Sequence, residues 1–90
     1  MKSRREIDDM IADDNFQEAI DALSAMIEND GDNAELYFER GKLLWRINDR
    51  RNAINDILKA MELNPDSPAR QYLEHINSIM SFYDKDRYNP

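Results

Sequence analysis

The residues of this chain that could perform chemistry are acidic side chains and one histidine. The sequence contains no cysteine and a single histidine, His75, so it offers no thiolate nucleophile and no thiolate metal ligand. Glu74 is adjacent to His75, but successive residues of a helix do not face each other, so the two form no acid–base pair. The sequence also has no glycine-rich phosphate-binding loop. We therefore expect no enzymatic activity, no catalytic residues and no cofactor.

Two acidic segments are the remaining places where a cation could bind. They are DDMIADDN, from Asp8, and ENDGDNAE, from Glu28. Neither segment has the ligand spacing and the closing glutamate of an EF-hand loop. Both segments fall at expected helix ends, where Asp and Asn are common capping and turn residues. The sequence therefore predicts no metal site.

The net charge of −7 is concentrated in the first third of the chain. Residues 1–33 hold 3 basic and 10 acidic side chains, residues 34–66 hold 6 of each, and residues 67–90 hold 3 of each. A nucleic-acid partner needs a basic surface, so this distribution predicts no nucleic-acid binding. We interpret the acidic third as a solvated face; the alternative is a patch that steers a basic partner.

The size and composition indicate one helical domain. Ninety residues bury a modest core, and the 2 glycines and 3 prolines among many helix-forming residues favour an all-α fold. No apolar run approaches the roughly 18–20 residues of a membrane span, and MKSRREIDDM lacks the apolar stretch of a signal peptide. We therefore expect a soluble cytoplasmic protein with no membrane partner.

Two segments of the sequence match at a shift of 34 residues. The segments are FQEAIDALSAMIENDG, from Phe16, and RNAINDILKAMELNPD, from Arg51, and the shift of 34 is the distance from Ala19 to Ala53. When Ala19 is aligned with Ala53, the apolar columns fall at helical spacing, so each segment is expected to form an amphipathic helix. With the segments around them, they give five expected helices, at about 3–12, 16–29, 33–47, 50–63 and 68–82.

Residues typical of helix ends stand at these boundaries. Gly31 and Pro65 are expected to end helices at equivalent places of the two units. Capping patterns are expected at the helix starts, namely Asn15 with Glu18, Asp32 with Glu35, Asp49, and Ser67 before Pro68.

A helix–turn–helix unit of 34 residues resembles the tetratricopeptide repeat (TPR). The second unit matches the family pattern through Tyr37, Gly41, Leu44, Ala53, Ile57, Ala60 and Pro65, and KAMELNPD is similar to the end of the family consensus. The first unit keeps Phe16, Ala19 and Leu23 but has Ile7, Met26 and Gly31 where the family has a glycine, a small residue and a proline. A third unit would have only one helix, with His75 in place of the glycine. SPARQYLEHINSIMSFYDKDRYNP is similar to the end of small stand-alone bacterial proteins of this kind.

The resemblance implies an all-α, right-handed α-α superhelix of two TPR-like hairpins and a C-terminal capping helix. Its parts would be repeat one at about 2–32, repeat two at 33–66, the capping helix at 67–82 and an aromatic tail at 83–90. It also implies a non-enzymatic protein–protein interaction module or scaffold that binds a peptide or partner through a concave aromatic groove. The alternative is a self-assembling structural protein, either a homodimer or a chain whose groove holds its own tail.

The first helix of each hairpin lines the concave surface in this family. Carried over to this chain, the expected partner-binding residues are Ile11, Phe38, Lys42, Trp45, Arg46, Tyr72, Ile76 and Ile79. The competing interpretation is that the apolar members are core, and it is strongest for Tyr72 and Ile76. One subset of the family clamps a terminal carboxylate through Lys, Asn and Arg. We do not expect that function, because Arg4 matches one clamp position and the others hold Asp8, Glu39, Ala69 and Leu73.

Aromatic residues gather in the tail SFYDKDRYNP, as Phe82, Tyr83 and Tyr88. Ordering the nine residues from Phe82 costs about 13 kcal/mol, which burial of about 500 Å² of apolar surface would offset. Three aromatic side chains can supply that area. We expect Phe82 and Tyr83 to pack on the preceding helices and Tyr88 to lie along the protein or a neighbour.

Overall fold

The computed structural model describes residues 4–83, with side chains as far as Ser78, and this part of the chain is helical without strands. Each helix lies within two residues of its expected bounds. The five helices are α1 (Arg4–Ala12), α2 (Phe16–Asn29), α3 (Ala34–Arg46), α4 (Arg50–Leu63) and α5 (Ala69–Tyr83).

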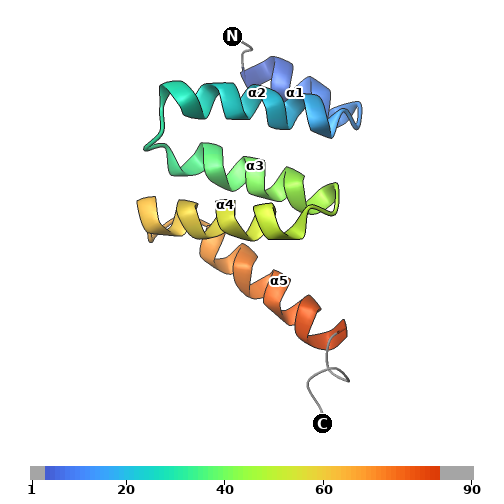
Figure 1. Cartoon of the computed structure of the whole chain (residues 1–90), viewed down its shortest axis with the longest axis vertical. Coiled ribbons are helices and arrows are strands. Elements are labelled where there is room, and N and C mark those ends of the chain that lie inside the picture. Colours follow the sequence, from blue (N-terminus) through green and yellow to red (C-terminus); the bar gives the residue numbers. More distant parts are fainter. Residues whose placement is uncertain (1–3, 84–90) are drawn as a thin grey trace.

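The helices are stacked in chain order, each running back against the one before it (Figure 1). The most extensive contact is between α3 and α4, followed by that between α2 and α3. The last helix, α5, leaves the stack at an angle and packs chiefly on α4 (Figure 1). No helix in the described range 4–83 is long and apolar enough to cross a membrane.

The turns that end α1 and α3 are the same structure, 34 residues apart. Asp14 and Asn48 both adopt the left-handed conformation, with φ of 64° and 73°. Each is the C′ residue of a Schellman motif, in which two amides bond back to the last turn of the helix. The paired hydrogen bonds are Asn15 N to Met10 O (2.7 Å) with Asp14 N to Ile11 O (3.0 Å), and Asp49 N to Leu44 O (2.9 Å) with Asn48 N to Trp45 O (3.1 Å).

The starts of α3 and α5 repeat at the same interval. Asn33 Oδ1 accepts a hydrogen bond from the Glu35 amide at 3.1 Å, and Ser67 Oγ accepts one from the Ala69 amide at 3.1 Å. The capping expected at Ser67 is therefore confirmed. The turn bonds thus keep a period of 34 residues from the end of α1 to the start of α5.

Two expected capping patterns are wrong. Asn33 caps α3 in place of Asp32, since Asn33 has the extended backbone that brings its side chain over the first turn. Asn15 is the N-cap residue of α2 but makes no side-chain cap bond, because it also closes a Schellman turn and its ψ of 61° is not extended.

The other expected helix ends are confirmed. Asp49 is the N-cap residue of α4, although its side chain makes no cap bond. Gly31 and Pro65 each follow the last residue of a helix, Asn29 or Leu63, at the same distance, and Gly31 does so without a positive φ.

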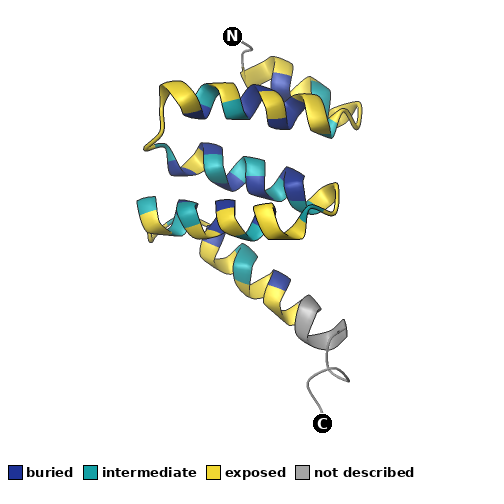
Figure 2. Cartoon of the chain, viewed as in Figure 1, coloured by how far each residue is buried: buried dark blue, intermediate teal, exposed yellow. Residues whose placement is uncertain are grey.

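The core lies between the facing sides of α2, α3 and α4 (Figure 2). Leu23 and Ile57 are fully buried, and Ala53 and Ala60 leave room for close helix approach. At Gly41, an added Cβ would lie 2.9 Å from Ile57 Cδ1 and 3.1 Å from the Ala53 carbonyl oxygen. The close contact between α3 and α4 therefore requires glycine at this position.

The outer face of α5 ends the stack. In α3 the core-facing positions Tyr37, Gly41 and Leu44 are packed against neighbouring helices. The residues 34 positions later are polar and exposed, namely Gln71, His75 and Ser78. A further helix hairpin would find no apolar surface there, which is the property of a capping element.

Candidate functional site

A groove runs along one face of α3. Its first part is a hollow of about 270 Å³ lined by Ile11 from α1, Tyr72 from α5, and Glu39, Lys42, Leu43 and Arg46 from α3. Its second part is a hollow of about 350 Å³ lined by Ala34, Glu35, Phe38, Glu39, Lys42, Asn64, Asp66, Ser67 and Pro68. The two hollows share Glu39 and Lys42 in their linings, so they lie next to each other along α3, and we call the two together the α3 groove.

The local sequence explains why these side chains share a face. Glu35, Phe38, Lys42 and Arg46 follow one another at intervals of three or four residues, which places them along one stripe of a helix. Helices α1 and α5 flank this stripe and supply the walls. The groove is therefore built from the first helix of each 34-residue unit.

The structure brings together most of the expected partner-binding residues whose side chains it describes. Ile11, Lys42, Arg46 and Tyr72 line the first hollow. Phe38 lines the second, although its side chain is only 9% exposed and its ring meets that of Tyr72 edge-on, at 5.7 Å between centroids. Phe38 therefore forms the floor of the groove.

Two expected residues stand elsewhere. Ile76 is fully buried, so its assignment to an open binding surface is wrong. Ala69, two helical turns earlier on α5, is also fully buried and packs on the core around Ile57, so this stripe of α5 belongs to the core. Trp45 is half-buried against the core and lines neither hollow; the Arg50 guanidinium lies 5.1 Å from its ring centroid.

The remaining expected contacts cannot be placed. Ile79, Phe82 and Tyr83 belong to α5, but their side chains lie outside the described part of the chain. Tyr88 lies beyond the last described residue. The expected docking of the tail therefore stays a prediction.

Two cations lie along the α3 groove, Lys42 where the two hollows meet and Arg46 in the first hollow. Lys42 Nζ lies 4.5 Å from the Phe38 ring centroid, and the Arg46 guanidinium lies 4.8 Å from that of Phe16. These cation–π contacts hold both side chains in place. Within residues 4–78, no carboxylate pairs with either cation within 4 Å.

Tyr72 lies on the α5 wall of the groove, close enough to Arg46 to feel its charge. Burial of the side chain raises the pKa of the Tyr72 hydroxyl, and the positive charge of Arg46 partly opposes that rise. Tyr72 therefore presents a neutral hydroxyl beside the cations at physiological pH.

Carboxylates dominate the other end. Arg4 pairs with Glu39 through both terminal guanidinium nitrogens and lies 3.6 Å from the Glu35 carboxylate. The Glu35 side chain remains 70% exposed, and Asp66 is exposed on the same rim. The α3 groove is thus positive near Arg46 and negative near Glu35.

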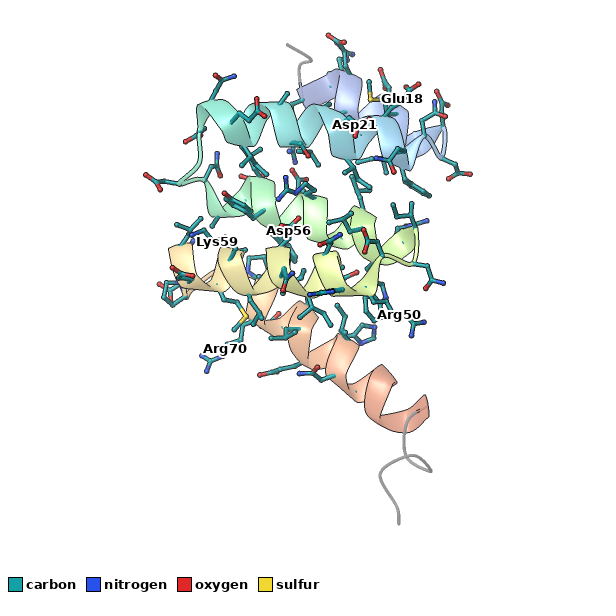
Figure 3. The ribbon with its side chains drawn as sticks, in the orientation of Figure 1. Glu18, Asp21, Arg50, Asp56, Lys59 and Arg70 are labelled. Atoms are coloured by element: carbon teal, nitrogen blue, oxygen red, sulfur yellow. The ribbon has the colours of Figure 1, made fainter. Side chains whose placement is uncertain are left out.

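The most buried charge of the described chain was not anticipated from the sequence. Asp56, on α4, accepts hydrogen bonds from Arg40 Nε (2.6 Å) and Nη2 (2.8 Å), and Arg40 Nη1 donates to Ser24 Oγ (3.1 Å). Figure 3 places Asp56 between α3 and α4. The bond to Asp56 raises the pKa of the Arg40 guanidinium further. The sequence does contain a signal for this pair, because Arg40 and Asp56 each interrupt an apolar stripe of a helix and carry opposite charges.

The exposed acids of the first third of the chain are spread over more than one face. Glu18 and Asp21 are exposed on α2, and Arg50 and Arg70 lie toward the other end of the stack (Figure 3). Gln17 Nε2 donates to Asp21 Oδ1 at 3.1 Å within α2, whereas Asp30 and Asp32 share a hollow with Glu35 of α3. No group of three or more potential metal-ligating side chains is assembled among the described residues.

The fold and groove define an all-helical protein of stacked hairpins with a structural period of 34 residues. Comparison with protein-family models, with curated proteins and with solved structures gives no match. A functional assignment therefore depends on the geometry of the groove.

Proposed function

We propose that this chain is a non-enzymatic protein–protein interaction module of the TPR type, which binds an extended segment of a partner protein in the α3 groove. The proposed architecture is a right-handed superhelix of two TPR-like hairpins, closed by α5. The observation that carries this proposal is that two hollows lie next to each other along α3 and share Glu39 and Lys42.

The repeated turns support the TPR-type architecture. The Schellman turns at Asp14 and Asn48 and the caps at Asn33 and Ser67 keep the 34-residue period that the sequence resemblance implies. The groove also lies where that resemblance expects a binding surface, on the first helices.

The chemistry of the α3 groove suits a peptide. Ile11 and Tyr72, both half-buried, supply apolar and aromatic contact area above the buried Leu43, while Lys42 and Arg46 supply hydrogen-bond donors. A few polar groups placed around apolar walls give both affinity and orientation. An extended peptide, which carries apolar side chains and charged groups along one strand, fits that pattern.

Self-assembly has less support in the described structure. As far as Ser78, where the described side chains end, the outer face of α5 is polar, and this part disfavours end-to-end stacking. Among the residues whose side chains are described, the large exposed hydrophobic residues are Ile47 and Leu58, at 38% and 47% exposure. Stable dimer interfaces bury about 800 Å² on each partner around an apolar centre, more than two separate side chains provide.

Selection of peptides tests the proposed function. Random extended peptides displayed on phage would be selected against the full chain, and the binders mapped by NMR on the isotope-labelled protein. We expect chemical-shift changes to cluster at Ile11, Leu43 and Tyr72. Changes centred on the other hollow beside α3, which Asn52 and Asn55 of α4 line with Ile20 of α2, would contradict the proposal.

A further inference from the structure

We propose that the partner segment carries an acidic and a basic side chain about five residues apart, with the acid at Lys42 and Arg46 and the base at Glu35 and Asp66. This inference rests on the proposed function and adds the chemistry of the ligand. It assigns a fixed polarity to the α3 groove, so that the ligand is recognised by the separation of its two charges.

The acid-binding end is defined by two cations that lack a partner carboxylate within residues 4–78. Lys42 and Arg46 are one helical turn apart on α3, and both line the first hollow. Each is held over an aromatic ring, Phe38 or Phe16, at 4.5 or 4.8 Å. Side chains already held in place lose less conformational entropy on binding a carboxylate. Charge-assisted hydrogen bonds from two such donors are the strong kind.

The base-binding end is defined by carboxylates that keep free faces. Arg4 binds both oxygens of Glu39 and also pairs with Glu35 at 3.6 Å, but the Glu35 side chain is still 70% exposed and can accept a second cation. Asp66 stands exposed across the second hollow, on the turn that precedes α5. A lysine or arginine of the ligand placed between Glu35 and Asp66 would therefore meet a carboxylate on each side.

The distance between the two ends sets the spacing. Glu35 and Arg46 are separated by eleven helical steps, or about 16 Å along the axis of α3. An extended chain covers about 3.3 Å per residue, so about five residues join the two charges. The residues between them would lie over Phe38, Leu43 and Tyr72, which favours apolar side chains there.

The charge spacing also argues for a partner in trans. The chain's own tail reads DKDRYNP from Asp84, with acids and bases alternating at successive positions. Because its acids and bases stand close together, the tail offers no acid and base about five residues apart that could reach Arg46 and Glu35 at the same time. A terminal carboxylate is disfavoured as well, because the clamp position that the sequence does fill, Arg4, is occupied by Glu39.

Two peptides of identical composition test the spacing. The matched probe is acetyl-Glu-Leu-Ser-Leu-Ser-Lys-amide, and the control is acetyl-Leu-Ser-Glu-Lys-Ser-Leu-amide, in which the charges are adjacent. Both would be titrated into the full chain by isothermal calorimetry at low salt. We expect the matched probe to bind about tenfold more tightly, the effect of one additional charge-assisted contact. Equal affinities would overturn the inference.

Two protein variants test the location. Lys42→Gln combined with Arg46→Gln removes the cations from the groove, while Arg51→Gln combined with Arg70→Gln removes the same charge from exposed positions elsewhere. We expect the first variant to bind the matched probe at least tenfold more weakly, about 1.4 kcal/mol, and the second to bind as the wild type does. An equal loss in both variants would show that only net charge matters and would overturn the inference.

The outcomes separate the inference from the proposed function. If peptides selected from the random library bind in the α3 groove but show no preferred charge separation, the charge rule is wrong and the interaction module stands. If neither probe binds and no selected peptide shifts the groove resonances, both are wrong. If the chain is a dimer whose mass falls in the Lys42→Gln, Arg46→Gln variant, a second copy occupies the groove and the inference is overturned.

Discussion

The Arg40 guanidinium donates two hydrogen bonds to the Asp56 carboxylate across the interface of α3 and α4, from Nε to Oδ2 at 2.6 Å and from Nη2 to Oδ1 at 2.8 Å. The pair lies in the contact region where Gly41 allows the two helices to approach. Arg40 also donates to Ser24 Oγ at 3.1 Å, so one side chain joins α2, α3 and α4. This geometry fixes how the first hairpin meets the second.

Removal of the carboxylate should destabilise the fold. In Asp56→Ala the Arg40 charge would lose both bidentate bonds while its side chain remained only 22% exposed. We expect the free energy of unfolding to fall by about 2–3 kcal/mol, less than for a completely buried pair because Arg40 retains some water. Urea denaturation monitored by circular dichroism measures the loss.

The companion variant for this pair is Arg40→Met combined with Asp56→Ala. This double variant removes both charges, so no unpaired group is left. Its free energy of unfolding should fall by about 1–2 kcal/mol less than the sum of the decreases in the two single variants. Strict additivity would show that the pair contributes no coupling energy.

The helices themselves could be read from the sequence, because periodicity and capping residues are local signals. All five helices were predicted to within two residues. The Arg40–Asp56 pair could not be found in the same way, since it depends on which residues of two helices come into register. A charge inside an apolar stripe shows only that some compensation exists, and the fold decides which partner supplies it.

Substitution of Gly41 should show the close contact of α3 with α4. An added Cβ would lie 3.1 Å from the Ala53 carbonyl oxygen, which is backbone and cannot rotate away. We expect Gly41→Leu to lower the free energy of unfolding by about 1–3 kcal/mol through overpacking. The melting temperature of the variant, followed by circular dichroism, checks this result.

Gly31 provides the matched glycine control. A Cβ at this position would meet only the Ile27 carbonyl oxygen, at 3.6 Å, and φ is not in the left-handed region. Gly31→Ala should therefore change the free energy of unfolding by less than about 0.5 kcal/mol. If Gly41→Leu were no more harmful than Gly31→Ala, the packing argument would fail.

The left-handed turn residues offer a test of the structural repeat. Asn48 has φ of 73°, a conformation that costs a residue with an ordinary Cβ about 1 kcal/mol. We expect Asn48→Ala to lower the free energy of unfolding by about 1 kcal/mol and Asn48→Gly to leave it equal or higher. The equivalent changes at Asp14 should give the same order, because both turns carry the same pair of hydrogen bonds. Chemical denaturation of the four variants provides the comparison, and a reversed order at either turn would refute the shared geometry.

The groove was only partly predictable, and Ile76 shows why. The helical spacing of Tyr72, Ile76 and Ile79 identifies an apolar stripe on α5, but spacing does not say whether a stripe faces the core or a groove. That choice depends on the tilt of α5 against α4, which the sequence does not encode locally. Lys42 and Arg46 do line a hollow, because they lie on the stripe of α3 that faces Ile11 and Tyr72, and whether a partner binds there stays a prediction.

Tyr72 gives the groove a dependence on alkaline pH. Burial disfavours the phenolate, so the pKa of Tyr72 in the folded chain lies above its ordinary value near 10. The folded state therefore holds the proton more tightly than the unfolded state, and this contribution to stability is complete below about pH 10 and is lost as the pH rises through the folded pKa. Absorbance of tyrosinate in a pH titration measures the ionisation, with Tyr72→Phe identifying the component that belongs to this residue. Because the charge of Arg46 favours the phenolate, Arg46→Gln should raise the pKa of Tyr72 further. Ionisation of Tyr72 below pH 10, or a downward shift in Arg46→Gln, would contradict the placement of the two side chains on facing walls of the α3 groove.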